Sequence, residues 1–114
     1  MEEEQATFEG ENGAPGGNYL LLPYKANEIN AVMAAPRGET TRVYVNRDGE
    51  PLATGDAGAD VAFDDGRSYV DVSVGRMYRL LDAEKYDVAE LSLHPTEAGV
   101  SLFAFTFGSC VANP

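Results

Sequence analysis

The segment from Gly99 to Gly108 constrains the fold most, because every second residue from Phe103 to Phe107 is a phenylalanine. A period of two residues directs alternate side chains to opposite faces of a β-strand, so Phe103, Phe105 and Phe107 should share one face. The residues between them are small or apolar, which is typical of a strand inside a sheet rather than at its edge. We therefore predict that this segment is the central strand and that its phenylalanine rings point into the core.

The rest of the chain has the same strand-like character. No window keeps the period of about 3.6 residues that marks an amphipathic helix. Asp-Gly pairs at 48–49 and 65–66 separate alternating runs, and glycine permits the positive φ that a tight hairpin turn requires. The β-branched residues that should face the core are Val43, Val45, Val70 and Val72. About eight short strands at intervals of roughly 8–12 residues predict an all-β fold, an antiparallel β-sandwich of the jelly-roll type.

The length of the chain, 114 residues, suits a single core. Residues 1–17 are rich in Glu and Gly and carry few large apolar side chains, so we predict a flexible acidic linker or tail there. The β-sandwich domain should then occupy residues 18–109, and residues 110–114 should form a C-terminal tail.

The charge of the chain excludes several classes of partner. Eight basic and nineteen acidic residues give a net charge of −11, which repels nucleic acid and anionic membrane surfaces. No apolar run reaches the roughly 18 residues of a membrane span, so we expect no direct membrane insertion. The start, Met-Glu-Glu-Glu, lacks the features of a signal peptide. We expect either a cytoplasmic chain or a domain cut from a longer protein.

Few residues in this chain could perform catalysis. Cys110 is the single cysteine, so the chain cannot form an internal disulfide or cycle between thiol and disulfide. His94 is the single histidine, and a zinc site would need further nitrogen or sulfur ligands. The motif Gly-x-Ser-x-Gly is absent, and most acids fall in turns rather than in a pattern expected for a glycosidase pair. We expect no catalytic residue and no enzymatic activity.

Turn acids raise the question of a bound cation. Asp56, Asp60, Asp64 and Asp65 bracket one short predicted strand, so their loops could lie at one end of a sandwich. Calcium takes carboxylate and backbone oxygens, although the spacing here differs from that of an EF-hand loop. We expect no cofactor and no metal site, with calcium as the alternative.

Tyrosines supply the best candidates for ligand binding. If the valines face the core, Tyr44, Tyr69 and Asp71 project from the opposite face of their strands. Should those strands share a sheet, the three form a polar and aromatic patch, bordered by Arg76 and Tyr78. Such a surface suits a neutral saccharide or an extended peptide. The alternative is that the tyrosines lie on different sheets and only shield the backbone.

Four segments of the second half together resemble a known module. They are Gly58-Ala-Asp60-Val61, Arg76-Met-Tyr78-Arg-Leu80, Gly99-Val and Phe103-Ala-Phe-Thr-Phe-Gly108. In this order they are similar to the C-terminal domain of DipZ-type thioredoxin-family proteins. In those proteins a thioredoxin-like domain is followed by a β-sandwich that resembles carbohydrate-binding modules. The resemblance covers roughly residues 24–108.

The resemblance implies a jelly-roll accessory domain of an extracytoplasmic redox protein, periplasmic or in the cell envelope. It implies a non-catalytic module that recognises a glycan or a partner domain. The alternative is a structural or oligomerisation domain that docks a thioredoxin-like partner. Because no Cys-x-x-Cys occurs in the chain, any redox role belongs to a partner or to another part of a longer protein.

Overall fold

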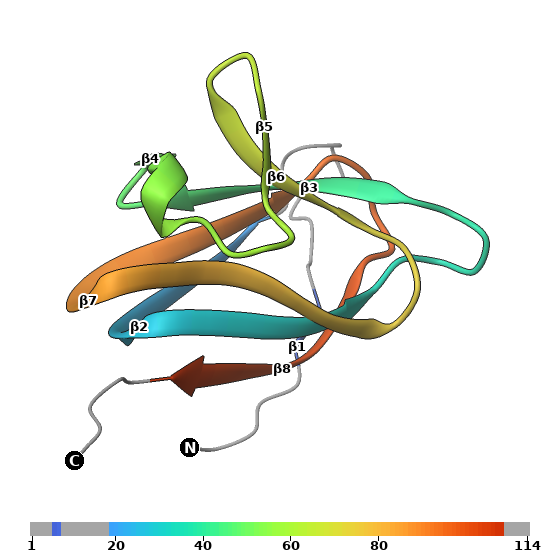
Figure 1. The fold of residues 1–114 in the computed structure, drawn as a ribbon. Helices are drawn as coiled ribbons and strands as arrows, with labels where there is room; N and C mark the ends of the chain where they lie inside the picture. The colour runs from blue at the N-terminus through green and yellow to red at the C-terminus, as the bar shows by residue number, and fades with distance from the viewer. Residues whose placement is uncertain (1–5, 8–18, 109–114) are drawn as a thin grey trace.

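The computed structural model describes residues 6–7 and 19–108, and the structural statements below concern those residues. They form an eight-stranded antiparallel sheet in the order β1-β8-β2-β7-β3-β6-β5, with β4 paired to β3 (Figure 1). The strands are β1 (Ala6–Thr7), β2 (Leu20–Ala34), β3 (Thr41–Arg47), β4 (Glu50–Pro51), β5 (Ala62–Asp64), β6 (Arg67–Val72), β7 (Arg76–Pro95) and β8 (Ser101–Gly108), with a short 3-10 helix η1 (Thr54–Asp56). The predicted all-β fold class is confirmed. None of the described helices is long and apolar enough to cross a membrane.

Two long strands, β2 and β7, hold the sheet together and bend it. They pair from Leu20 opposite Leu93 to Met33 opposite Arg76. Between Ala26 and Glu28 of β2 the register shifts, because β7 carries extra residues there. Extra residues on one strand of a pair bend it and increase its twist.

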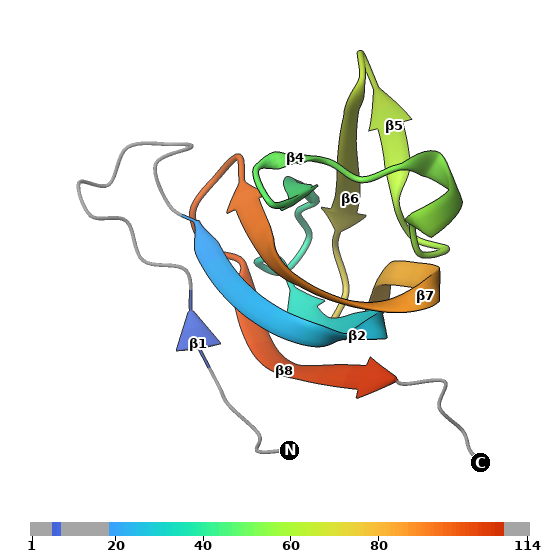
Figure 2. The same ribbon diagram turned by 90° about the vertical axis from the view of Figure 1, so that its left-hand side faces the viewer.

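The bend gives the sheet two layers. Strand β8 pairs with the C-terminal part of β2, whereas β3 pairs with the C-terminal part of β7. Figures 1 and 2 show the result, with β8 on one side of β2 and β7, and β3, β6 and β5 folded over on the other. The fold is therefore one open antiparallel sheet that bends over itself into two layers, which is compatible with the predicted β-sandwich.

The hydrophobic core lies between the two layers. Every valine predicted to face inward is at most 1% exposed, which confirms the register of β3 and β6. The other layer contributes buried side chains from β2 and β7. They include Ile29, Ala31, Met33, Leu80 and Leu81, whereas Leu91 and Leu93 belong to the β3 layer because they pair with Arg47 and Val45.

Both predicted hairpin turns are present. Asp48 and Gly49 have φ of 52° and 82°, and Asp65 and Gly66 have φ of 55° and 77°. Positive φ at both central residues is the signature of a type I′ turn, whose twist matches that of the flanking strands. The first turn joins β3 to β4 and the second joins β5 to β6.

The prediction for the phenylalanine-rich strand is wrong in two respects. Strand β8 is not central, because β1 pairs with it only at Ser101 and Leu102, whereas β2 and β7 lie inside the sheet. Phe103 and Phe107 are 44% and 38% exposed, and Phe105 packs against the core from its margin. A register shift opposite Val32 and Met33 leaves Phe103 without a partner in β2, whereas Phe107 lies opposite the buried Ile29 near the end of β8. Leu102 is buried in the core instead.

The N-terminal boundary also differs from the expectation. Ala6 and Thr7 fall inside the predicted linker 1–17, yet they form β1 against β8. The rest of that segment and the predicted tail, which contains Cys110, lie outside the described residues.

Candidate aromatic binding face

Strand pairing brings aromatic side chains into one row on the outer face of a layer. Tyr44 of β3 lies opposite Tyr69 of β6 and, on its other side, opposite His94 of β7. Tyr19, which precedes β2, stacks on His94 with ring centroids 5.6 Å apart. Directly opposed residues in antiparallel strands share a face. We call Tyr19, His94, Tyr44 and Tyr69 the aromatic row; its two strand tyrosines share one sheet and one face, so the alternative that they lie on different sheets does not hold.

Two arginines cover the tyrosines of this row. The guanidinium carbon of Arg42 lies 3.6 Å from the centroid of the Tyr69 ring, and that of Arg67 lies 3.7 Å from the Tyr44 ring. The two rings meet edge to face, with centroids 6.2 Å apart. Cation–π contacts and an edge-to-face ring pair restrict the orientation of all four side chains. The row is therefore an ordered surface rather than a set of independent side chains.

Arg42 also connects the row to acidic side chains. Its guanidinium lies 3.4 Å from Asp71 and 3.3 Å from Asp64. Interaction with Tyr44 raises the pKa of Arg42, and Tyr69 and Asp71 raise it further. The predicted site residue Asp71 thus does lie beside the tyrosines. Because Arg42 already pairs with it, Asp71 offers a ligand only part of its hydrogen-bonding capacity.

His94 serves the row as a neutral ring. Burial lowers the pKa of His94 below its usual value of 6.5, and nearby Arg67 lowers it further. One ring nitrogen, Nε2, lies 2.8 Å from the Ser92 hydroxyl. At neutral pH the imidazole is therefore uncharged and stacks as an aromatic platform beside Tyr19.

Tyr78 is not a surface residue, contrary to the prediction. It is fully buried, and its hydroxyl accepts a hydrogen bond from the Ser73 amide at 2.9 Å and donates one to the Val74 carbonyl at 2.7 Å. Two-residue alternation places Tyr78 on the same inward face as Leu80, so a surface ligand cannot reach its ring. Its role is to close the turn between β6 and β7.

Arg76 belongs with Tyr78 rather than with the aromatic row. Its guanidinium stacks on the Tyr78 ring at 4.0 Å and pairs with Asp60 at 3.0 Å. No contact in the described chain joins it to Tyr44 or Tyr69. The predicted site therefore divides into the row with Asp71 and a separate structural cluster around Asp60.

Two of the four segments behind the family resemblance, Gly58-Ala-Asp60-Val61 and Arg76-Met-Tyr78-Arg-Leu80, meet in this structural cluster. The amide of Gly58 donates to the Leu80 carbonyl at 3.0 Å, and a carboxylate oxygen of Asp60 accepts from the Arg79 amide at 2.8 Å. Its ion pair with Arg76 lowers the pKa of Asp60. The two motifs thus fasten the chain before β5 to the first half of β7.

The turn acids do not converge on a cation. Asp56 pairs with Arg47 at 3.1 Å, while Asp60 and Asp64 pair with other arginines. Across residues 6–7 and 19–108, the structure holds no group of three or more His, Cys, Asp or Glu side chains placed to bind a metal. The expected absence of a metal and the calcium alternative both stay predictions.

A pocket of about 280 Å³ opens where β7 bends. It is lined by Arg47, Asp56, Ala83, Glu84, Lys85 and Asp87. Both charge signs are present on its wall, and the Arg47–Asp56 ion pair occupies one side. The pocket therefore lacks the apolar lining that usually holds a small organic ligand.

Sequence reasoning missed Tyr19, His94, Arg42 and Arg67 as members of this face. The two arginines stand two residues from Tyr44 and Tyr69 on the same strands, so strand periodicity alone could have placed them beside the rings. Tyr19 and His94 join the row only through pairing between β2, β7 and β3, which carries no local signal.

Comparison with known proteins gives one family. No curated protein matches the chain. The family model described as "Thioredoxin like C-terminal domain" matches residues 1–108. That range includes β1, the folded sheet, the aromatic row and the cluster around Asp60. The chain belongs to the thioredoxin-like C-terminal domain family.

Proposed function

We propose that this chain is a non-catalytic accessory module of the DipZ type, that it works outside the cytoplasm, and that its aromatic row binds a saccharide. Membership of the family supports an accessory role beside a thioredoxin-like domain. The observation that carries the ligand class is the alignment of Tyr19, His94, Tyr44 and Tyr69 across neighbouring strands.

The dimensions of the row suit a short oligosaccharide. Its rings stand on successive strands, so three inter-strand steps of about 4.8 Å give a length of about 14 Å. Sugar rings stack through their C–H groups on aromatic faces, and their hydroxyls need charged or amide partners. Arg42 and Arg67, which lie over the tyrosine rings, and Asp71 next to Arg42 provide those partners. A shallow, open face of this kind corresponds to dissociation constants between about 1 μM and 1 mM.

Titration of the isotope-labelled chain with neutral oligosaccharides tests this proposal. Amide shifts should concentrate around Tyr19, Tyr44 and Tyr69, and Tyr69→Ala should weaken binding at least tenfold. Tyr86→Ala is the matched control, because Tyr86 is an exposed tyrosine (48%) that lies in the bend of β7. Shifts that avoid the row, or equal binding by the Tyr69 and Tyr86 variants, would remove the site.

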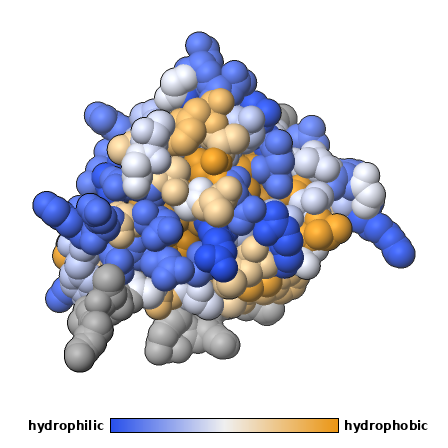
Figure 3. Space-filling view, viewed as in Figure 1, coloured by the Kyte–Doolittle hydropathy of each residue, from blue (hydrophilic) through white to orange (hydrophobic). Residues whose placement is uncertain are grey.

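A second candidate function is the docking of a thioredoxin-like partner domain, with β8 as the contact surface. Apart from Ser101 and Leu102, the described part of this strand is paired on the β2 side alone, and it exposes Phe103 and Phe107. Hydrophobic side chains also reach the surface among hydrophilic ones in Figure 3. Partner docking should shift β8 amides and weaken in Phe103→Ser, whereas saccharide binding should leave β8 unchanged. Mixing labelled chain with a thioredoxin-like domain separates the two.

A further inference from the structure

Arg67 is held in place without a carboxylate partner in the described structure. Three arginines stack on tyrosine rings, at distances between 3.6 and 4.0 Å. Arg42 and Arg76 are also paired with aspartates. Within residues 6–7 and 19–108, the Arg67 guanidinium stacks on the Tyr44 ring and forms no ion pair. Arg67 is an exposed residue, so its guanidinium is oriented by this one ring contact and is not neutralised.

The neighbours of Arg67 leave its guanidinium available to an anion. The neighbouring His94 is close enough for Arg67 to lower its pKa, so the imidazole adds an uncharged ring rather than a competing carboxylate. Asp64, which lies opposite Arg67 in the β5–β6 ladder, directs its carboxylate to Arg42 at 3.3 Å. A guanidinium stacked on a ring keeps its in-plane N–H donors for other groups. These donors match the two oxygens of a carboxylate.

We propose that Arg67 binds the carboxylate of an acidic sugar unit, a hexuronic acid, while the adjoining aromatic row holds the neighbouring neutral units. This inference rests on the proposed saccharide function and narrows its ligand class.

The overall charge of the chain sets a limit on that ligand. A net charge of −11 repels a densely charged polymer at long range. At physiological ionic strength this repulsion is screened beyond about 8 Å, whereas a direct contact with Arg67 is screened less. The ligand therefore carries isolated uronate units in an otherwise neutral chain.

Carboxyl reduction gives a test that alters one group of the ligand. The probes are short oligosaccharides that end in one glucuronate, galacturonate or mannuronate unit, each compared with its own carboxyl-reduced, neutral form. Binding to the whole chain is measured by calorimetry and by amide shifts. At least one acidic probe should bind about tenfold more tightly than its reduced form, as expected for one charge-assisted contact.

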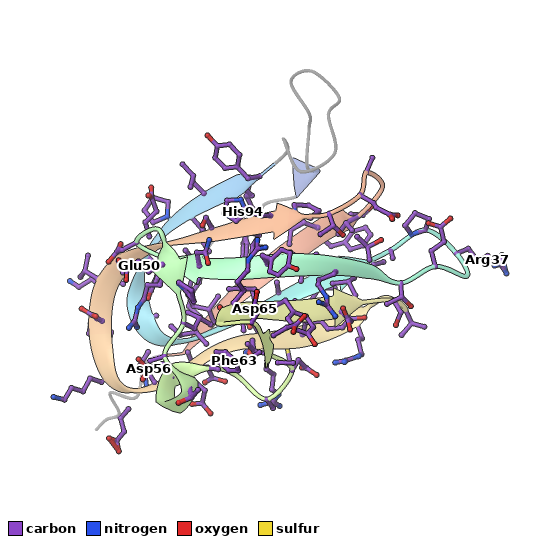
Figure 4. All side chains as sticks on the ribbon, turned by 90° about the horizontal axis from the view of Figure 1, so that it is seen from above. Arg37, Glu50, Asp56, Phe63, Asp65 and His94 are labelled. Atoms are coloured by element: carbon purple, nitrogen blue, oxygen red, sulfur yellow. The ribbon has the colours of Figure 1, made fainter. Side chains whose placement is uncertain are left out.

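Arg67→Gln should abolish that preference, and Arg67→Lys should retain part of it. Arg37→Gln is the control, because it changes net charge equally at the turn between β2 and β3, away from His94 (Figure 4). Thermal unfolding of each variant checks that it folds. If a variant does not fold, the comparison of acidic and reduced probes on the parent chain still tests the preference for a carboxylate.

The outcomes separate this inference from the proposed function. If reduced probes bind as well as acidic ones, the carboxylate inference fails and saccharide binding stands. If the preference persists in Arg67→Gln, the assignment to Arg67 fails. If neither acidic nor reduced probes bind, both the inference and the saccharide function fail.

Discussion

Substitution of Gly58 by alanine tests how the two family motifs hold the fold together. Gly58 is buried, and its amide donates to the Leu80 carbonyl at 3.0 Å. A Cβ built on Gly58 would collide with the carbonyl of Arg79 and would lie 2.8 Å from the amide nitrogen of Leu80. These are backbone atoms of β7, which also pairs with β2, so the obstruction cannot rotate away. Either the loop or the strand must shift.

The expected loss of stability follows from these contacts. Forcing extra volume into a packed site costs about 1–3 kcal/mol. A loop that moves away also weakens its hydrogen bonds to the Leu80 and Arg79 carbonyls, each worth about 0.5–1.5 kcal/mol. Because the loop can relieve strain by giving up hydrogen bonds, the two costs overlap. We expect a total loss of about 2–4 kcal/mol, a large part of the stability of a domain this size.

Urea denaturation followed by circular dichroism measures this loss. Gly55→Ala is the matched control, because a Cβ at Gly55 meets no atom within 4 Å, and its stability should stay within about 0.5 kcal/mol of the parent. If Gly58→Ala is as stable as Gly55→Ala, the segment before β5 does not lie against β7 and the reasoning is refuted.

Three further predictions concern the core and the titrating groups. Leu93→Ala should cost about 2–5 kcal/mol because Leu93 is fully buried, whereas Phe103→Ala should change the unfolding free energy far less; the reverse order in urea melts would restore the central-strand interpretation. Asp60 has a lowered pKa in the folded state, so the stability that its carboxylate contributes is present above its unfolded pKa of 3.8 and is lost as pH falls through the folded pKa. Asp60→Asn should therefore lose less stability than the parent between about pH 5 and about pH 3, and equal losses would contradict this. The pKa of His94 is also lowered, so protonation favours the unfolded chain as pH falls below 6.5. The parent should lose stability below that pH and His94→Gln should lose less. Identical curves of stability against pH for the two proteins would exclude a contribution from His94.

Local chemistry made part of the fold predictable. The Asp-Gly turns require positive φ whatever the rest of the chain does, and the alternating valines of β3 and β6 bury one face in any sandwich. The place of β8 was not predictable in this way, because the unpaired Phe103 arises from a register shift against β2. Nothing between Gly99 and Gly108 signals that shift.

The candidate site likewise has residues that the sequence could place and residues that it could not. Tyr44 and Tyr69 could be assigned to an outer face because their neighbours on each strand are core valines. Tyr78 has exposed neighbours instead, Met77 and Arg79, and its inward orientation follows from Leu80 on the same face. The mixed charges around Tyr78 concealed that alternation. The contribution of His94 depends on a pairing between β3 and the far half of β7, which a single sequence does not encode locally.

The continuity of β2 and β7 has a consequence for how the domain unfolds. Each strand passes through the bend and contributes to both layers, so neither layer has a complete set of strands of its own. Separation of the layers would break β2 and β7 in their interiors, and no partly unfolded form with one intact layer should accumulate. Unfolding should therefore be cooperative across the whole sheet. Because these pairings join distant parts of the chain, folding should be slow compared with that of helical domains of similar length.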